Sequence, residues 1–370
     1  MPVARLPALT LLAFISLVLA SGCSGEATPP SSLAFYFDGS GNSSISITRP
    51  DGTGRTDVSA SLPWEAFPAW SPDGSRIAFY AVSDLQRDVY IARADGSGAV
   101  NLTDNDDEDA FPVWSPDGSR IAFYSDRDGN GEVYLMNADG TGVTSLSDNP
   151  ALDFPYAWSP DGARLAFGSF RDGNLEIYTM DAAGSNVARL TDNPAADFAP
   201  SWSPAGDRIA WVSERDGNSD IYVANSDGSR PVNLTVHPLR DGSPVWSPGG
   251  DRIAFVSGRS GNDEVYVMDV TFSYLTRVTN SPREDTSPDW SPDGGRIAFV
   301  SNRDYNSEVY IANADGSAQT RLTDDPSPQR GPAWSPDGSR VAFESFRDGQ
   351  SEVYVVNSDG SGLTRLGGGR

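Results

Sequence analysis

The stretch W-S-P-D-G-S-R-I-A-F at residues 114–123 decides how this chain folds. It joins a tryptophan to a Pro-Asp-Gly turn and then to an apolar, β-branched run, a pattern typical of two short strands around a tight turn. A fixed spacing of 44 residues, with no insertion or deletion, predicts a repeat architecture. The repeated tryptophans are Trp70, Trp114, Trp158, Trp202, Trp246, Trp290 and Trp334.

Each unit reads as four short strands and no helix. In the unit that contains Trp114 we expect strands at 111–115, 120–125, 132–136 and 143–147, separated by turns rich in Gly, Asp and Asn. Strands that are apolar on both faces must be covered on both sides. Four-stranded sheets stacked around an axis provide that cover. The sequence therefore predicts an all-β fold, a β-propeller of four-stranded blades built from 44-residue repeats.

The number of blades depends on the first unit. The apolar residue that opens the second strand occurs eight times, from Leu33 to Val341, whereas the tryptophan strand occurs seven times. The first unit has no tryptophan strand before it, but it keeps the register of the others. We expect eight blades, the first one short; the alternative is seven blades with residues 33–60 at the periphery.

The repeat also resembles a known family. W-S-P-D-G-x-R-I-A-F, followed by R-D-G-N-x-E-V-Y, A-D-G-S and L-T, resembles the propeller repeat of TolB-like proteins, a relative of the WD-type blade. The resemblance covers residues 33–366, with small departures such as Ala205 and Gly249 in place of the motif Asp. TolB itself carries an α/β domain before its propeller, and nothing here corresponds to that domain. The role of TolB as periplasmic partner of the Tol–Pal envelope system is therefore not transferred to this chain.

The N-terminal residues resemble a bacterial lipoprotein signal. Arg5 precedes an apolar run at 8–20, and small residues lead to Cys23, the single cysteine. We expect residues 1–22 to be the signal peptide, Cys23 to be lipidated, and residues 23–32 to form a polar tether. The alternative is an ordinary secretory signal. The prediction is an exported protein, anchored to the membrane by lipid only and facing the periplasm or the extracellular side, with a propeller at 33–366 and a short tail at 367–370.

Charge and composition exclude several classes of function. The chain has 27 basic residues, all of them Arg, against 51 Asp and Glu, for a net charge of −24. Such a balance argues against nucleic acid as a partner. One cysteine and one histidine exclude a multi-cysteine or histidine-rich metal centre, and the absence of lysine excludes Schiff-base chemistry. We expect a monomer without a cofactor.

Two sets of arginines are candidates for structural or binding roles. The arginines of the W-S-P-D-G-x-R motif are expected to pair with turn aspartates on their own face; they are Arg76, Arg120, Arg164, Arg208, Arg252, Arg296 and Arg340. The arginines that follow the second strand are expected on the opposite rim; they are Arg127, Arg171, Arg215, Arg259, Arg303 and Arg347.

An acidic residue lies five positions before each tryptophan on that same rim, until Gln329 ends the series. One interpretation is that these carboxylates pair with the rim arginines. The other interpretation is a ring of oxygens at the channel mouth that binds Ca²⁺ or a cationic peptide. No particular residues are assigned as metal ligands. The acidic residues are Glu65, Asp109, Asp153, Asp197, Asp241 and Asp285.

Three functions remain open at this point. The leading hypothesis is a protein- or peptide-binding scaffold in the cell envelope. The second is a carbohydrate or cell-wall binder, because Phe170, Tyr305 and Phe346 lie in the loops after the second strands. The third is a propeller lyase or hydrolase that uses residues at the channel mouth. The chain has no G-x-S-x-G elbow, and its one histidine, His237, replaces a loop residue, so we expect no enzymatic activity.

Overall fold

A computed structural model describes residues 33–36, 45–48, 56–57, 64–83, 86–93, 98–271, 274–335, 337–345, 347 and 352–365. The predicted signal peptide, Cys23, the tether and the tail at 367–370 lie outside these residues. The described part of the chain consists of strands and turns and contains no helix, which confirms the all-β prediction. It follows that no described helix is long and apolar enough to span a membrane.

The strands form seven four-stranded antiparallel sheets and one three-stranded sheet. The three-stranded sheet contains β1 (Leu33–Tyr36), β2 (Ile45–Thr48) and β3 (Thr56–Asp57). The first three complete sheets are β4 (Trp64–Trp70), β5 (Arg76–Ser83), β6 (Gln86–Arg93) and β7 (Val100–Asn101); β8 (Asp109–Trp114), β9 (Arg120–Ser125), β10 (Glu132–Asn137) and β11 (Thr144–Ser145); and β12 (Asp153–Trp158), β13 (Arg164–Ser169), β14 (Glu176–Asp181) and β15 (Ala188–Arg189).

The other four complete sheets follow the same order. They are β16 (Asp197–Trp202), β17 (Arg208–Ser213), β18 (Asp220–Asn225) and β19 (Val232–Asn233); β20 (Asp241–Trp246), β21 (Arg252–Ser257), β22 (Glu264–Asp269) and β23 (Leu275–Arg277); β24 (Asp285–Trp290), β25 (Arg296–Ser301), β26 (Glu308–Asn313) and β27 (Thr320–Arg321); and β28 (Gln329–Trp334), β29 (Arg340–Ser345), β30 (Glu352–Asn357) and β31 (Thr364–Arg365).

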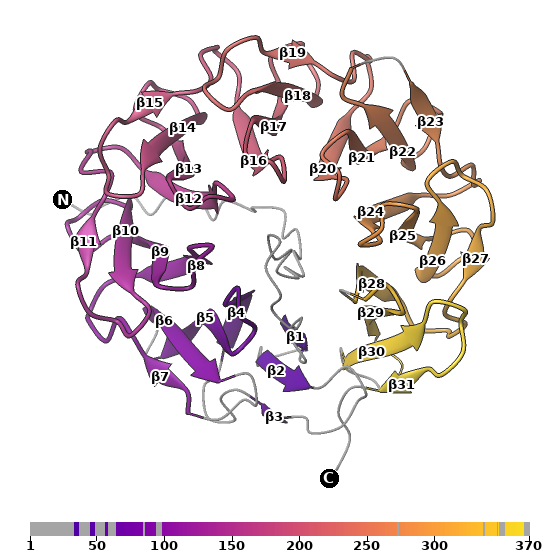
Figure 1. The fold of residues 1–370 in the computed structure, drawn as a ribbon, viewed down its shortest axis with the longest axis horizontal. Helices are drawn as coiled ribbons and strands as arrows, with labels where there is room; N and C mark the ends of the chain where they lie inside the picture. Colours follow the sequence, from indigo (N-terminus) through magenta and orange to yellow (C-terminus); the bar gives the residue numbers. More distant parts are fainter. Residues whose placement is uncertain are drawn as a thin grey trace, which may run out of the picture.

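The sheets stand around a common centre as the blades of a propeller. The first strand of each complete sheet lies nearest the centre and the last strand lies at the circumference (Figure 1). The three-stranded sheet lies between β4 and the sheet that contains β28, with the backbone of β1 beside that of β4 (Figure 1). Among the described residues it has no strand inside β1, in agreement with the missing tryptophan strand of the first unit. The eight-blade count itself stays a prediction.

The core lies between neighbouring blades and is made of the same residue types at each junction. Trp158, Leu165 and Phe167 of one blade pack against Ala122 and Val133 of the blade before it. The indole Nε1 of the inner-strand tryptophan also donates a hydrogen bond to a carbonyl of the preceding inner strand. These bonds join Trp114 to Ala69 (2.9 Å), Trp158 to Val113 (3.2 Å), Trp202 to Ala157 (3.2 Å), Trp246 to Ser201 (3.1 Å) and Trp290 to Val245 (3.1 Å).

Several described arginines of the W-S-P-D-G-x-R motif join blades, where pairing with turn aspartates was expected; Arg252 makes both contacts, because its Nε also lies 3.7 Å from Asp251 Oδ1 in the turn. The Arg120 guanidinium lies 5.2 Å from the ring centre of Trp158 in the next blade and donates to the Ala182 carbonyl at 3.0 Å. The turn aspartates are held by hydroxyl groups instead; Ser115 Oγ donates to Asp117 at 2.6 Å. The same stacking on the next tryptophan occurs for Arg76, Arg164, Arg252 and Arg296.

Each inner strand carries a bulge near its start. In β8 the pairing with β9 shifts between Ala110 and Val113, and the intervening Phe111 has a φ of 54°. The inserted residue here has a left-handed conformation, which small residues adopt more easily than bulky ones. In β12 the proline at position 155 cannot take a positive φ, and the shift there lies between Pro155 and Ala157.

Candidate functional site

The start of every inner strand lies at one end of the propeller. Asp109 of β8 pairs with Ser125 at the end of β9, and Ser125 pairs with Glu132 at the start of β10. We call this end the loop face: it carries the connections between second and third strands and those from one blade to the next. The opposite end, with the W-S-P-D-G and A-D-G turns, is the turn face. The predicted rim residues therefore do share one face.

The acidic residues of this rim are buried and paired with the rim arginines. Asp109, Asp153, Asp197, Asp241 and Asp285 are at most 1% exposed. The structure thus supports the pairing interpretation rather than an open ring of oxygens. The Nη2–carboxylate distances are 3.0 Å for Arg127–Asp109, 2.8 Å for Arg171–Asp153, 2.7 Å for Arg215–Asp197, 3.0 Å for Arg259–Asp241 and 3.0 Å for Arg303–Asp285.

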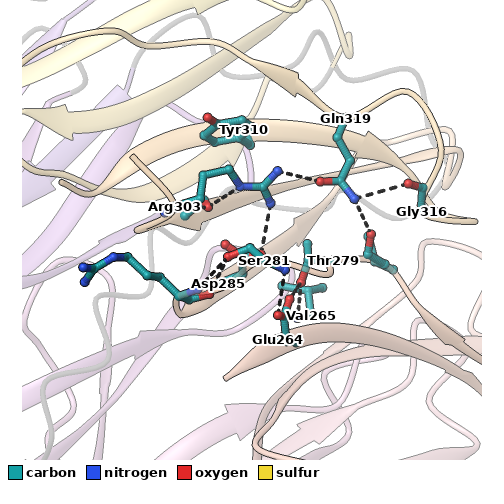
Figure 2. Close-up of polar contacts among 12 residues, drawn as sticks. Glu264, Val265, Thr279, Ser281, Asp285, Arg303, Tyr310, Gly316 and Gln319 are labelled. Carbon is teal, nitrogen blue, oxygen red and sulfur yellow. Dashed lines mark hydrogen bonds and ion pairs between the residues drawn. The ribbon is translucent and has the colours of Figure 1, made fainter. Parts of the chain in front are cut away.

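The junction around Asp285 shows how such a pair is held (Figure 2). Arg303 binds Asp285 and donates a hydrogen bond from Nε to Ser301 Oγ at 2.7 Å. Its guanidinium lies 4.4 Å from the ring centre of Tyr310. Burial raises the pKa of Asp285 to about 6, because the lowering by Ser301 and Arg303 does not offset burial and the nearby Glu264. Glu264 belongs to the preceding blade, so this cluster of charges is a blade-to-blade contact.

Gln329 and Glu65 are the exceptions in this series. Gln329 is buried where five other blades have Asp. Arg347 keeps the bond to Ser345 Oγ, at 2.9 Å, that the other rim arginines make to their serines, and its Nε lies 3.6 Å from Asp325 Oδ2. The side chains of Glu65 and Trp70 lie outside the described residues. Among the residues that are described, no group of three or more His, Cys, Asp or Glu side chains is arranged to hold a metal ion.

The blades differ most at one pair of residues near the start of the inner strands. The residue that follows the rim Asp, Glu or Gln on the inner strand lies opposite a residue near the end of the second strand. Around the ring this pair changes from aromatic to aliphatic to polar. The pairs are Ala66 with Tyr80, Ala110 with Tyr124, Phe154 with Gly168, Phe198 with Val212, Gly242 with Val256, Thr286 with Val300, and Arg330 with Glu344.

Half-buried aromatic rings from two neighbouring junctions lie on one side of the loop face. Phe111 meets the ring of Tyr80 edge-on at 5.7 Å and that of Tyr124 at 6.3 Å. Phe154 and Tyr156 of the next blade meet at 5.1 Å. We call these five residues the aromatic arc. Sequence reasoning missed it, although a comparison of equivalent positions between repeats would have separated these blades from the rest.

Exposed apolar and basic side chains mark another part of the loop face. Val236 is 73% exposed, Leu239 47% and Tyr305 83%. The Arg283 guanidinium lies 4.1 Å from the ring centre of Tyr305, and Arg240 pairs with Asp263. These residues come from consecutive loops of the blades that begin at β20 and β24. We call Val236, Leu239, Arg240, Arg283 and Tyr305 the exposed sector.

His237 and two aromatic candidates from the sequence fall in or near these loops. His237 Nδ1 accepts a hydrogen bond from the Leu239 backbone N–H at 3.2 Å, the role that an asparagine side chain has in the equivalent loop of the preceding blade. Phe170 is half-buried, unlike the exposed Tyr305. Phe346 lies outside the described residues. Only Tyr305 of the three predicted aromatics is therefore a freely exposed ring in the described structure.

Comparison with known proteins identifies the family. The model of the TolB beta propeller domain matches residues 28–153, 145–240 and 243–369. Among solved structures, TolB from Acinetobacter baumannii is 22% identical over 82% of each chain with a TM-score of 0.47. Oligogalacturonate lyase from Vibrio parahaemolyticus is 15% identical with a TM-score of 0.60, covering 88% of this chain and 96% of the lyase.

Dipeptidyl peptidase 4 from Porphyromonas gingivalis is 14% identical with a TM-score of 0.66, covering 91% of this chain and 57% of the peptidase. No curated protein matches the sequence. The lyase and the peptidase share the fold with this chain, and identities this low carry nothing beyond the fold. The family match, in contrast, extends over nearly the whole propeller. This chain belongs to the TolB beta propeller domain family.

Proposed function

We propose that this protein is an exported, lipid-anchored binding scaffold whose loop face binds another protein or a peptide of the cell envelope. The proposal of export and anchoring is supported by the signal-like residues 1–22 and Cys23. The proposal of binding is supported by the exposed sector. We propose binding rather than catalysis, because the side chains that repeat around the loop face form buried pairs within the fold.

The exposed sector departs from the repeat in the direction expected of a contact surface. The loops equivalent to the one with Val236 carry Asp148 and Asp192 at that position, and Leu239 is Ala195 in the preceding loop. Exposed valine, leucine, tyrosine and arginine side chains gain free energy when a partner covers them, and tyrosine and arginine dominate many interfaces.

A binding experiment with matched variants tests this proposal. The chain is immobilised and exposed to detergent-solubilised envelope of its own source, and retained proteins are identified by mass spectrometry. We expect Leu239→Asp to lose a partner that wild type retains. Val187→Asp, at a 40% exposed site on the turn face, should retain that partner. Equal retention by all three proteins, or by none, would contradict a role for the exposed sector.

Carbohydrate binding is the second candidate, favoured by the exposed ring of Tyr305. Aromatic side chains that present a face to solvent can stack on sugar rings, although Arg283 already covers part of this one. A glycan array probed with wild type and with Tyr305→Ser checks this candidate. Binding that disappears in the variant would support it, and a blank array would remove it.

A further inference from the structure

The aromatic arc contains a residue that the fold does not require. Phe111 occupies the inner-strand bulge with a φ of 54°. The equivalent residues in four later blades are Ala199, Ser243, Ser287 and Gly331, with φ between 52° and 55°. Phe67 repeats the aromatic in the preceding blade, and Pro155 stands there in the next. Small residues therefore satisfy the bulge, and a bulky side chain in this left-handed region costs free energy. An aromatic at this position points to a use outside folding.

Neighbouring glycines make space for the rings of the arc. A Cβ added at Gly168 would come within 2.7 Å of Phe154 and 2.9 Å of Tyr156. A Cβ added at Gly131 would collide with the Tyr124 ring. Other blades carry side chains at these two positions, such as Val212 and Ser219. The backbone is thus adapted to the rings in this part of the propeller.

Negative charge surrounds the arc on the loop face. Arg87 supplies positive charge to this cluster: its Nη1 lies 3.4 Å from Glu108 Oε2, and its guanidinium lies 5.9 Å from the Tyr80 ring centre. The Glu108 backbone N–H donates to Asp126 Oδ1 at 2.8 Å, which brings a second carboxylate beside the first. Asp106 and Asp107 precede them in the same loop.

The pKa values of Glu108 and Tyr124 reflect burial first and the neighbouring carboxylates second. Burial raises the pKa of Glu108 despite the opposing effect of Arg87, and Asp126, Asp109 and Asp88 raise it further. Burial raises the pKa of Tyr124 as well, with Asp126 and Glu108 adding to the shift. A further positive charge would therefore be stabilised here.

We propose that the aromatic arc, together with Glu108 and Asp126, binds an arginine side chain of an extended peptide. The proposal rests on the proposed function and names the chemistry of the bound segment. A guanidinium group stacks on aromatic faces and forms paired hydrogen bonds with carboxylates, so it matches both parts of the site. Arg87 shows this combination within the chain, because it contacts Tyr80 and Glu108 at once.

Peptide titration with repeat-matched variants tests the inference. The probe is the capped peptide Ac-Gly-Arg-Gly-Arg-Gly-NH2, and its control is the same peptide with citrulline, which is uncharged, in place of arginine. Isothermal titration in 150 mM salt screens the long-range attraction of the acidic surface. We expect wild type to bind the arginine peptide and not the citrulline peptide. Phe111→Ser, Tyr124→Val and Glu108→Gln should each weaken binding about fivefold or more.

The variants are chosen so that folding is preserved. Serine occupies the equivalent of residue 111 in two blades and valine occupies the equivalent of residue 124 in three. Leu239→Asp, in the exposed sector, should bind the arginine peptide as wild type does. Unchanged binding in Phe111→Ser combined with Tyr124→Val would overturn the inference, as would equal binding of the citrulline peptide or binding of oligosaccharides instead.

The two proposals can fail separately. A partner that is lost from Leu239→Asp while wild type ignores the arginine peptide would leave the scaffold standing and remove the arginine site. Peptide binding at the arc without any partner captured through the exposed sector would do the reverse.

Discussion

Asp289 is the residue at which one blade junction departs from the others. Its position on the inner strand holds Ala, Val or Ser in the other complete blades. Its Oδ2 accepts a hydrogen bond from the Trp334 backbone N–H at 2.8 Å. The buried Nε1 of Trp334 has no hydrogen-bond partner among the described residues, unlike the five tryptophans that donate to a carbonyl. Burial raises the pKa of Asp289 to about 7.

Asp289→Val, which copies Val245, should raise the melting temperature at pH 8 by several degrees and have little effect at pH 4. The folded-state pKa lies above the ordinary value of 3.8, so the folded chain binds this proton more tightly than the unfolded chain. The associated stability is present below about pH 4 and is lost as pH rises through 7. Thermal unfolding followed by circular dichroism at pH 4, 6 and 8 measures the difference.

Ser201→Val is the control, because it makes the same kind of change at the equivalent position of a junction without the carboxylate. Its effect should not vary with pH. A gain in Asp289→Val that is as large at pH 4 as at pH 8 would mean that side-chain volume, and not ionisation, governs this junction.

At the scale of elements, a buried threonine connects the outer strands of a blade to the loop that leads to the next blade. Thr279 Oγ1 accepts a hydrogen bond from the Val265 backbone N–H at 2.8 Å and donates one to Glu264 Oε2 at 2.5 Å. Glu264 also binds Arg277 and the Ser281 backbone N–H. The same arrangement recurs with Thr191 and Glu176 and with Thr323 and Glu308.

Thr279→Val should reduce the free energy of unfolding by about 2 kcal/mol, because it leaves a buried backbone N–H and a carboxylate oxygen without this partner. Urea unfolding followed by fluorescence measures the loss. Thr276→Val is the matched control: its Oγ1 is buried and has no hydrogen-bond partner in the described structure, so removal of that hydroxyl should be neutral or stabilising. Equal losses in the two variants would contradict the assigned role of Thr279.

The strands were predictable because each is marked locally. The expected strand at 120–125 matches β9, and the expected strand at 111–115 lies within two residues of β8. The bulge at Phe111 was not predictable, because it depends on the register of two strands. The partner of Arg120 was missed for a related reason: the Trp158 ring and the Ala182 carbonyl that it contacts lie 38 and 62 residues further along the chain.

At the scale of the whole molecule, the aspartates form two groups with opposite responses to pH. Burial raises the pKa of Asp153, Asp197 and Asp241, and that of Asp285 to about 6. In the turns, hydrogen bonds from Ser115 and Ser119 hold the pKa of Asp117 at about 2, and those from Ser335 and Ser339 do the same for Asp337.

We therefore expect the melting temperature to pass through a maximum between about pH 4 and 6. The buried group, with raised pKa values, contributes stability at low pH that is lost as pH rises towards neutrality. The turn group, with lowered pKa values, contributes stability above about pH 4 that is lost as pH falls towards 2. Calorimetry at one-unit steps from pH 2 to 9 and constant ionic strength checks this. A melting temperature that rises steadily from pH 4 to pH 8 would contradict it.

The candidate site was less predictable than the ring. The repeat placed Asp197 and Arg215 on one face, and the structure brings them to 2.7 Å, but their burial follows from the packing of neighbouring blades. The exposed sector and the aromatic arc consist of departures from the repeat, such as Val236 and Phe111. Such a departure indicates a surface site only when the repeats are compared with one another and the buried positions are known.

The contacts from Arg120 to Trp158 and from Trp158 back to Val113 give the ring a direction, since the same atoms join most of the successive blades that the structure describes. A blade duplicated or deleted as a unit of 44 residues would meet neighbours that present the same kinds of junction contact. The molecule can thus change its diameter in whole steps through gene duplication or loss, without inventing a new interface. Only duplication of a blade next to Asp289 would introduce a different junction, the one in which Asp289 binds the Trp334 backbone N–H.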